Sequence, residues 1–271
     1  MVSDPRQTSL VIATYNWPSA LDLVLKSILE QSVLPGEIVI ADDGSTNETK
    51  QVIDRYKELF KIPIKYHWHE DRGYQKSIIL NKAMRNITKD YIIQIDGDVI
   101  LEHRFIEDHI KSSETGCWLN GSRVLLGKTV SKEIQSSGRI EFSPFSKDIT
   151  NRLNAVRSSL LADLLFSKSA FSTEARGCNM SYWRKDFFQV NGFNEDIVGY
   201  SREDSELAAR LTNIGVKRKK LKFRAVQYHI DHKLASRERS EANINIEKET
   251  IAQGKKVCIN GLEKLDPSIL G

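Results

Sequence analysis

The chain has 271 residues, 40% of them hydrophobic and 28% charged, a composition typical of a globular protein with one large domain or two small ones. Its 15 glycines and 6 prolines are too few for a collagen-like or low-complexity chain. The formal net charge of +4 is too small for a protein dedicated to nucleic acids, and we expect no nucleic-acid partner.

Strand and helix patterns alternate over the first hundred residues. Short apolar runs typical of strands buried on both faces occur at 9–13, 37–41, 64–68 and 91–95. Between them, helical spacing of apolar residues occurs at 18–31, from 46 or 47 to 60, and at 75–86. Strands joined by helices pair in parallel, so this order predicts an α/β fold with a mostly parallel central sheet and flanking helices.

The rest of the chain is less regular. Ser, Lys and Gly are frequent from 121 to 146, which favours long loops, and we expect a lid over 121–150. Helices are expected at 151–166 and 236–254, with a second ordered block between 173 and 233. No repeat or linker is visible. We therefore expect a single domain over 1–235, made of parts 1–110, 111–172 and 173–235, and a helical tail over 236–271.

Cysteine content and hydropathy limit the environment of the protein. Cys117, Cys178 and Cys258 fit neither a zinc-binding spacing nor a disulfide framework, which favours a reducing compartment. No apolar run approaches the roughly 18 residues of a membrane span. We expect a cytoplasmic protein, either free or peripheral at the inner face of the membrane.

Polar and acidic residues follow three of the four predicted strands. They are Thr14, Tyr15 and Asn16 after the first, Asp42 and Asp43 after the second, and Asp96 and Asp98 after the fourth. In α/β sheets, ligands bind beyond the carboxyl ends of the strands. The sequence therefore predicts a site at this edge of the sheet.

Each acidic pair has a functional and a structural interpretation. Asp96 and Asp98 are two residues apart, so their carboxylates can point the same way and form an oxygen-rich site for Mg²⁺ or Mn²⁺. An ordinary Asp-Gly turn is the alternative. Asp42 and Asp43 could accept hydrogen bonds from a nucleobase N–H or a ribose hydroxyl, or serve only as a loop acid and a helix cap.

Two further pairs of titratable residues occur in the second ordered block. Glu203 and Asp204 lie at the start of a predicted helix, where the helix dipole favours carboxylates whatever their role; the functional alternative is a general base. His229 and His232 are three residues apart after a predicted strand. They are either surface histidines or two ligands of a Mn²⁺-type ion.

A basic segment precedes these histidines. Residues 217–224 read KRKKLKFR, with six basic residues in eight. A strand with a solvated face, and with Leu221 and Phe223 turned inward, is one interpretation. A patch for anionic lipid head groups or a phosphorylated acceptor is the other. The segment lacks the interleaved aromatic residues of single-strand nucleic-acid binders.

Four segments, in this order, resemble the family 2 glycosyltransferases of GT-A fold. They are SLVIATYN from residue 9, IVIADDGS from residue 38, DRGYQKSIILNKA from residue 71 and YIIQIDGD from residue 91. A later segment, RGCNMSYWRKDFFQVNGFNEDIVGYSREDSEL from residue 176, is similar to the C-terminal half of β-1,4-galactosyltransferases and bacterial chondroitin-type polymerases. The resemblance covers about residues 8–110 and 173–233. It departs from the family where Gln75 occupies a position that is often basic.

The resemblance assigns a role to each candidate residue. It implies that the donor nucleotide is held by Thr14, Tyr15, Asn16, Asp42, Asp43, Gly73 and Lys76. It implies that Asp96, Asp98, His229 and His232 are metal ligands, with Asp98 the more direct of the two aspartates and Asp96 nearer the ribose or the metal. The donor sugar would contact Gly177 and Asn179, and the acceptor would stack on Tyr200. Asp204 would be the catalytic base, and Glu203 would hold a sugar hydroxyl.

The implied activity is inverting, metal-dependent transfer from a UDP-sugar, with galactose or N-acetylgalactosamine as the expected sugar. The implied acceptor is a saccharide or lipid-linked saccharide in bacterial surface polysaccharide synthesis, and the implied cofactor is Mn²⁺ or Mg²⁺. In this scheme, 1–110 is the nucleotide-binding half, 111–172 a variable insert and 173–235 the acceptor and catalytic half. The alternatives are an inactive nucleotide-sugar-binding subunit, which the acids and histidines disfavour, and a nucleotidyltransferase, whose Gly-rich loop is missing.

Overall fold

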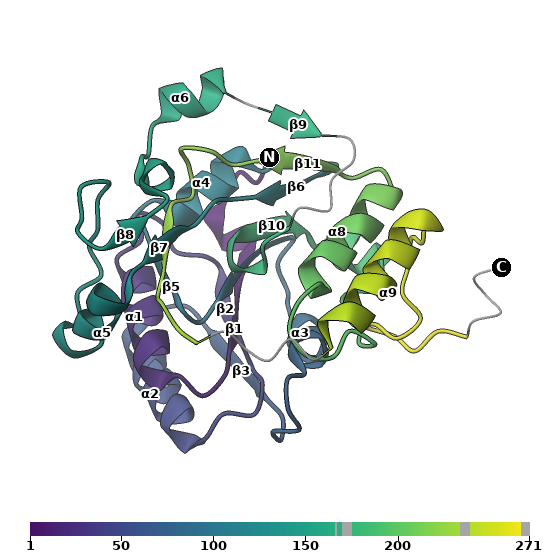
Figure 1. The fold of residues 1–271 in the computed structure, drawn as a ribbon, viewed down its shortest axis with the longest axis horizontal. Coiled ribbons are helices and arrows are strands. Elements are labelled where there is room, and N and C mark those ends of the chain that lie inside the picture. Colours follow the sequence, from purple (N-terminus) through teal and green to yellow (C-terminus); the bar gives the residue numbers. More distant parts are fainter. Residues whose placement is uncertain (166, 170–174, 234–238, 267–271) are drawn as a thin grey trace.

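The computed structural model describes residues 1–165, 167–169, 175–233 and 239–266. Its main feature is an eight-stranded sheet with the order β3-β2-β1-β4-β10-β6-β11-β9 (Figure 1). These strands are β1 (Thr8–Thr14), β2 (Glu37–Asp42), β3 (Ile64–Trp68), β4 (Tyr91–Asp96), β6 (Cys117–Asn120), β9 (Ser167–Ser169), β10 (Met180–Trp183) and β11 (Lys217–Lys220).

The strands of this sheet pair in parallel on one side and in mixed directions on the other. The four N-terminal strands pair in parallel, as expected from the alternation of strands and helices. β10 runs antiparallel to both β4 and β6, and β11 is parallel to β6 but antiparallel to β9. The predicted α/β class with a central sheet and flanking helices is confirmed. The sheet as a whole is mixed, and its uniformly parallel part is the N-terminal half.

Helices cover both faces of the sheet (Figure 1). In β1, Leu10 and Ile12 pack into one core cluster, and the alternating Val11 and Ala13 pack into another on the opposite face. The first cluster includes residues of α1 (Pro18–Leu29), α2 (Asn47–Leu59) and α4 (Phe105–Ser112). The second includes residues of α3 (Lys76–Met84), α7 (Arg184–Gln189) and α8 (Glu203–Asn213). This two-sided burial explains why β1 and β2 are apolar throughout most of their length.

The segment expected to form long loops is largely ordered, and that expectation was wrong. It contains β7 (Val124–Leu126), α5 (Lys128–Ser137) and β8 (Ile149–Thr150). With β5 (Val99–Leu101) and β12 (Gln227–His229), these strands form a second sheet of order β5-β12-β7-β8. Val130 and Ile134 of α5 are buried in a third core cluster beneath this sheet. Within 121–150, the longest stretch without helix or strand is 138–148.

The continuous helix expected at 151–166 is also not observed. A 3₁₀ helix (Arg152–Ala155) and the short α6 (Ser159–Leu164) occupy this segment, and residue 166 lies outside the described residues. Two further 3₁₀ helices are found at Pro5–Gln7 and Gly177–Asn179. Within the described ranges, none of the helices combines the length and apolar character needed to cross a bilayer.

The C-terminal residues pack on the sheet-bearing body. The helix expected at 236–254 is α9 (Ser240–Ala252); the proposed boundary at 235 and residues 236–238 lie outside the described residues. α9 lies along α8 (Figure 1), and beyond it Leu262 joins the core cluster formed by α3, α7 and α8. Cys258 is buried there, and all three cysteines are free thiols.

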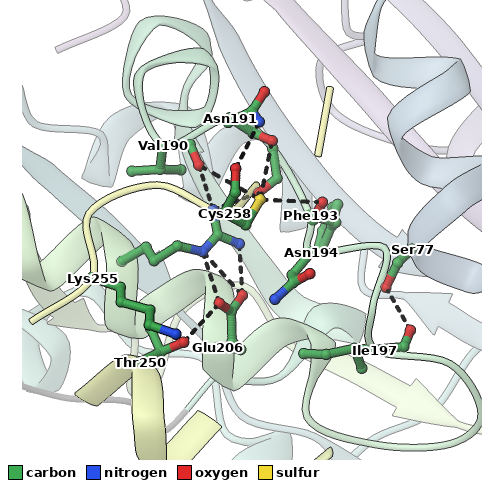
Figure 2. Close-up of polar contacts among 12 residues, drawn as sticks. Ser77, Val190, Asn191, Phe193, Asn194, Ile197, Glu206, Thr250, Lys255 and Cys258 are labelled. Atoms are coloured by element: carbon green, nitrogen blue, oxygen red, sulfur yellow. Dashed lines mark hydrogen bonds and ion pairs between the residues drawn. The ribbon is translucent and has the colours of Figure 1, made fainter. Parts of the chain in front are cut away.

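A buried ion pair joins α8 to this C-terminal segment. Arg210 and Glu206, one turn apart on α8, have 0% and 1% of their side chains exposed, and Nη2 of Arg210 lies 2.7 Å from a Glu206 carboxylate oxygen. Arg210 also donates to the Gly192 carbonyl at 2.7 Å, and Thr250 of α9 donates to Glu206 at 3.1 Å. Figure 2 shows Glu206, Thr250 and Cys258 in this network. These bonds satisfy two charges that would be costly to bury alone.

We predict that Glu206→Gln lowers the free energy of unfolding by about 3 kcal/mol or more, because it leaves the Arg210 charge buried without its partner. Urea denaturation followed by circular dichroism measures this loss. The matched control is Glu133→Gln, which breaks an ion pair with Arg139 that is about half exposed and should cost less than about 1 kcal/mol. Equal losses of unfolding free energy in the two variants would contradict the prediction that the buried pair stabilises the fold more than the exposed one.

Candidate active site

A cavity of about 1020 Å³ lies beyond the carboxyl ends of β1, β2 and β4. This is enough volume for a nucleotide-sized ligand. Its lining includes most of the residues singled out from the sequence: Thr14, Tyr15, Asn16, Asp43, Lys76, Asp96, Asp98, Gly177, Tyr200, Glu203, Asp204, His229 and His232. Residues as far apart in the chain as Thr14 and His232 therefore meet in one place.

Three of the predicted residues do not line the cavity. Asp42 is fully buried, accepts a hydrogen bond from the Tyr66 hydroxyl at 2.7 Å and caps the backbone N–H of Ser45 at 2.8 Å. Gly73 is an exposed glycine at φ 82°, in the left-handed region that favours glycine. Asn179 is buried behind the cavity wall and donates to the carbonyls of Ser122 and Ala225. Direct ligand contacts by these three stay predictions.

The loop after β1 is held in an uncommon conformation. Asn16 adopts φ 44°, its backbone N–H donates to Ser45 Oγ at 2.8 Å, and its side-chain oxygen accepts from the N–H of Thr46 at 2.9 Å. These bonds tie the ends of β1 and β2 together at the cavity edge. Tyr15, 51% exposed, is thereby presented beside the cavity rather than packed into the core.

Asp43, at the end of β2, is fixed by two contacts. One carboxylate oxygen lies 2.7 Å from His69 Nε2, and the other accepts a hydrogen bond from the backbone N–H of Gln75 at 2.9 Å. Burial raises the pKa of Asp43, and these two contacts oppose the rise. His69, which was not among the predicted site residues, is thus a partner of a cavity-lining carboxylate.

Asp98, His229 and His232 form a compact group. Their ligand atoms all lie within 4.8 Å of one another; His232 Nε2 is 3.1 Å and His229 Nε2 3.6 Å from Asp98 Oδ2. The register of β12 against β5 explains the approach, because His229 pairs with Val99, the residue after Asp98. His232 donates through Nδ1 to the Lys233 carbonyl at 2.9 Å, which leaves Nε2 directed at Asp98.

This group fits a divalent cation. Asp98 Oδ1 is buried and lacks a hydrogen-bond partner among the described residues, so an oxygen ligand is available. One carboxylate and two imidazoles suit Mn²⁺-type ions. Without a cation, the hydrogen bond to Asp98 raises the pKa of His232 to about 9. Cation binding would therefore displace a proton from this imidazole.

Asp96 lines the same cavity but has a different partner. Its carboxylate lies 2.9 Å from Lys76 Nζ, and Glu203 lies 3.3 Å from the same ammonium group. Burial alone would lower the pKa of Lys76, but the carboxylates of Asp96, Asp204 and Glu203 outweigh it and raise this pKa well above its ordinary value. Lys76 therefore stays charged, and Asp96 lies outside the group formed by Asp98 and the two histidines.

Asp204 lies at the cavity wall with two hydrogen-bond donors. The backbone N–H of Gly177 donates to Oδ2 at 2.8 Å, and the side-chain amide of Gln94 lies 3.2 Å from Oδ1. A Cβ at position 177 would lie 2.4 Å from both carboxylate oxygens, so only glycine permits this approach. Burial raises the pKa of Asp204 to about 7, with Lys76 opposing the rise and Glu203 and Asp96 adding to it. A carboxyl group with this pKa can gain and lose a proton near neutrality.

The loop before α8 is braced by α9. Ser201 and Arg202 both have positive φ, 85° and 84°. Asn243 of α9 donates to the Ser201 carbonyl at 3.1 Å, and Glu247 pairs with Arg202 at 3.1 Å. Tyr200, in the same loop, meets Tyr74 edge to face at 6.3 Å between ring centroids. α9 therefore helps to hold the two residues that connect Tyr200 to Glu203 and Asp204.

Sequence reasoning missed several residues of the site. Gln94 is the polar residue within the apolar run of β4; it is fully buried, and its Oε1 accepts from the Tyr182 hydroxyl at 2.7 Å, which aims its amide at Asp204. A polar side chain in a buried strand was the available signal. His109, fully buried, holds Asn179 through a 3.0 Å contact to its Oδ1. Tyr74, which lies within the segment DRGYQKSIILNKA but was given no role, and Arg123, which lies outside the quoted segments, also line the cavity.

Curated relatives and solved structures resemble this chain. Validoxylamine A glucosyltransferase of Streptomyces hygroscopicus subsp. limoneus is 26% identical over 227 residues, covering 77% of this chain and 48% of that protein. Chondroitin synthase of Pasteurella multocida is 29% identical over 103 residues, covering 38% of this chain and 10% of that protein. The chain thus spans about half the length of the first of these relatives, and a tenth of the second.

Among solved structures, S. aureus TarS 1–349 in complex with UDP has a TM-score of 0.60 and 17% identity, over 91% of this chain and 68% of that one. The mannosyltransferase PcManGT from Pyrobaculum calidifontis, in complex with GDP-Man and Mn²⁺, has a TM-score of 0.59 and 17% identity, over 85% and 59% of the two chains. At this identity the likeness concerns the fold.

Two family models match, and between them they cover every cavity-lining residue except Ser240. The model described as N-terminal domain of galactosyltransferase matches residues 164–233, which contain Gly177, Asp204 and both histidines. The model of glycosyl transferase family 2 matches residues 9–171, which is more than half of the chain and includes, apart from Thr8, the parallel strands β1, β2, β3 and β4. This protein belongs to glycosyl transferase family 2.

Proposed function

We propose that this protein transfers a sugar from a UDP-sugar to a hydroxyl group, with inversion at the anomeric carbon and with a divalent cation as cofactor. The observation that carries the proposal is the cavity itself. The cavity is lined by Asp204, a carboxyl group with a pKa near neutrality, and by Asp98, His229 and His232, whose side chains are suited to binding a divalent cation. A proton acceptor and a cation site are the two functions that such a transfer needs.

The donor would lie across the ends of β1, β2 and β4. Support for a nucleotide comes from structural neighbours that were solved in complex with UDP and with GDP-Man. Asp43 and Thr14 would face the nucleoside, and Lys76 and Asp96 the ribose and diphosphate. Galactose or N-acetylgalactosamine is the proposed sugar, supported by the match to the galactosyltransferase model and by the similarity to a chondroitin synthase.

Asp98, His229 and His232 would hold the cation, Mn²⁺ or Mg²⁺, with Asp96 as a further candidate ligand. The structural neighbour PcManGT was solved in complex with Mn²⁺. When bound to a diphosphate, such a cation stabilises the negative charge of the departing nucleotide. The positive charge of Lys76, enclosed by Asp96 and Glu203, would add to this stabilisation.

Asp204 would act as the base. Its carboxylate accepts the proton of an acceptor hydroxyl while the hydroxyl oxygen forms a bond to the anomeric carbon. The bond from that carbon to the diphosphate oxygen breaks, and UDP leaves with the electron pair. Attack opposite to the leaving group turns an α-linked donor into a β-glycoside. Gln94 and Gly177 hold the carboxylate in place during this exchange.

The acceptor would be a saccharide or a lipid-linked saccharide. Tyr200 at the cavity edge, supported by Tyr74, offers an aromatic face for a sugar ring, and Glu203 offers a carboxylate for a hydroxyl. Cytoplasmic location and a role in surface polysaccharide synthesis complete the proposal. An inactive nucleotide-sugar-binding subunit is the weaker alternative, because it would not need the near-neutral Asp204.

We predict that Asp204→Asn lowers kcat for sugar transfer by about 10²–10⁴-fold, the usual contribution of a general base. UDP affinity, measured by calorimetry with Mn²⁺ present, should change less than about twofold, since Asp204 would face the acceptor hydroxyl. Asp54→Asn, the same substitution at an exposed position on α2, is the control and should leave both values unchanged. Near-normal turnover in Asp204→Asn would remove this residue as the base.

The pH profile provides a second test of Asp204. Only its deprotonated form accepts a proton, and its pKa in the free protein is about 7. We therefore expect kcat/KM to rise about tenfold per pH unit below pH 7 and to level off above it. A profile measured with saturating Mn²⁺ that stays flat between about pH 5.5 and 8 would contradict this assignment.

Removing any member of the metal group should weaken cation binding. For Asp98→Asn, His229→Ala and His232→Ala, we predict that Mn²⁺ affinity in the presence of UDP falls at least about tenfold. Loss of a residue that only hydrogen-bonds to a metal ligand can already lower metal affinity by this factor. Calorimetry measures this directly. His103→Ala, at an exposed histidine outside the cavity, is the control. Unchanged affinity in all three variants would place the cation elsewhere.

A further inference from the structure

α6 turns its leucines outward. Leu160 has 79% of its surface exposed, Leu161 37%, Leu164 76% and the following Leu165 52%, and no residue of the helix is buried. Positions i, i+1, i+4 and i+5 lie on one face of a helix. We call these four residues the leucine face. Contiguous exposed apolar side chains of this kind mark sites of interaction with a partner or a membrane.

The end of the basic segment 217–224 contacts α6, the helix that carries the leucine face. The backbone N–H of Ser158, the N-cap of α6, donates to the Phe223 carbonyl at 3.0 Å, and Arg224 pairs with Asp163 of α6 at 2.8 Å. The same basic segment, 217–224, includes β11, which pairs with β9 at the end of the molecule where α6 projects (Figure 1). Its Lys217, Lys220 and Lys222 are exposed.

Exposed leucines together with a basic segment fit an anionic membrane better than a protein partner. A soluble protein segment would need its own acidic and apolar surface, whereas an anionic bilayer supplies both a negatively charged plane and an apolar interior at fixed depth. Docking of a second copy through the same surface is disfavoured, because two-fold pairing would bring two basic segments together. α6 is too short to span a bilayer, so its leucines could enter only the interfacial layer.

We propose that the leucine face of α6 and the basic segment 217–224 form one surface that docks on an anionic membrane. The leucines enter the boundary between head groups and acyl chains, and the lysines remain at the level of the lipid phosphates. This surface lies outside the cavity lining and is independent of the transfer chemistry. Combined with the proposed function, it would bring the protein to the membrane that carries a lipid-linked acceptor.

Sedimentation with lipid vesicles tests the proposal without donor or acceptor. The full chain should bind vesicles that contain about a third phosphatidylglycerol in phosphatidylcholine, and bind less at high salt. Leu160→Ser/Leu164→Ser should lower the partition coefficient about tenfold or more. Lys217→Ala/Lys220→Ala/Lys222→Ala should lower it about fivefold for each charge removed.

Controls separate docking from loss of structure and from self-association. Leu59→Ser, at the end of α2 and 55% exposed, should bind like the unmodified protein, and each variant should keep its thermal transition. Failure of the unmodified protein to bind anionic vesicles would overturn the proposal, as would equal binding by the double leucine variant. Light scattering that shows a dimer, converted to a monomer by Leu160→Ser/Leu164→Ser, would overturn it in favour of a second copy as the partner.

Discussion

The electrostatic balance around Lys76 governs the candidate active site. Its ammonium group lies between Asp96 and Glu203, with Asp204 close by in the same buried region. Burial raises the pKa of Asp204 to about 7; Lys76 opposes this rise, and the Glu203 and Asp96 carboxylates, which pair with the Lys76 ammonium group, add to it. A proton-accepting carboxyl group thus arises from the arrangement of its neighbours. The same arrangement would respond to an incoming diphosphate, which would compete for Lys76.

Different strands of the two sheets supply different parts of the cavity. The parallel strands β1, β2 and β4 end in short polar loops that would meet the nucleotide. The antiparallel β10 brings Gly177, through the 3₁₀ helix before it, against Asp204, and β12 brings the histidines to Asp98 through its pairing with β5. α9 then braces the loop before α8 from outside. Substitutions at Asn243 and Glu247 of α9, which do not line the cavity, would therefore act on the acceptor side of the site.

The parallel half of the fold was predictable because continuous apolar runs and helical spacing are local signals. The approach of His229 to Asp98 was not, because it depends on strand pairing across 130 positions; it was anticipated only through the family resemblance. Local patterns also gave a wrong prediction of long loops for 121–150. The short strands and α5 of this segment are stabilised by a core cluster in which most residues come from other parts of the chain. Similarly, spacing suggested equal roles for Asp96 and Asp98, yet their tertiary partners differ: a lysine for one and two histidines for the other.

The central claim is that this cavity binds a nucleotide sugar and a divalent cation and breaks the bond between the sugar and the diphosphate. Nucleotide release from a panel of UDP-, GDP- and dTDP-sugars, with Mn²⁺ or with a chelator, tests it most directly. The account predicts release from one or more UDP-sugars that depends on Mn²⁺ and increases when a suitable saccharide is added. Release that is equal with the chelator, or none from any UDP-sugar in the presence of Mn²⁺ and saccharide acceptors, would contradict it.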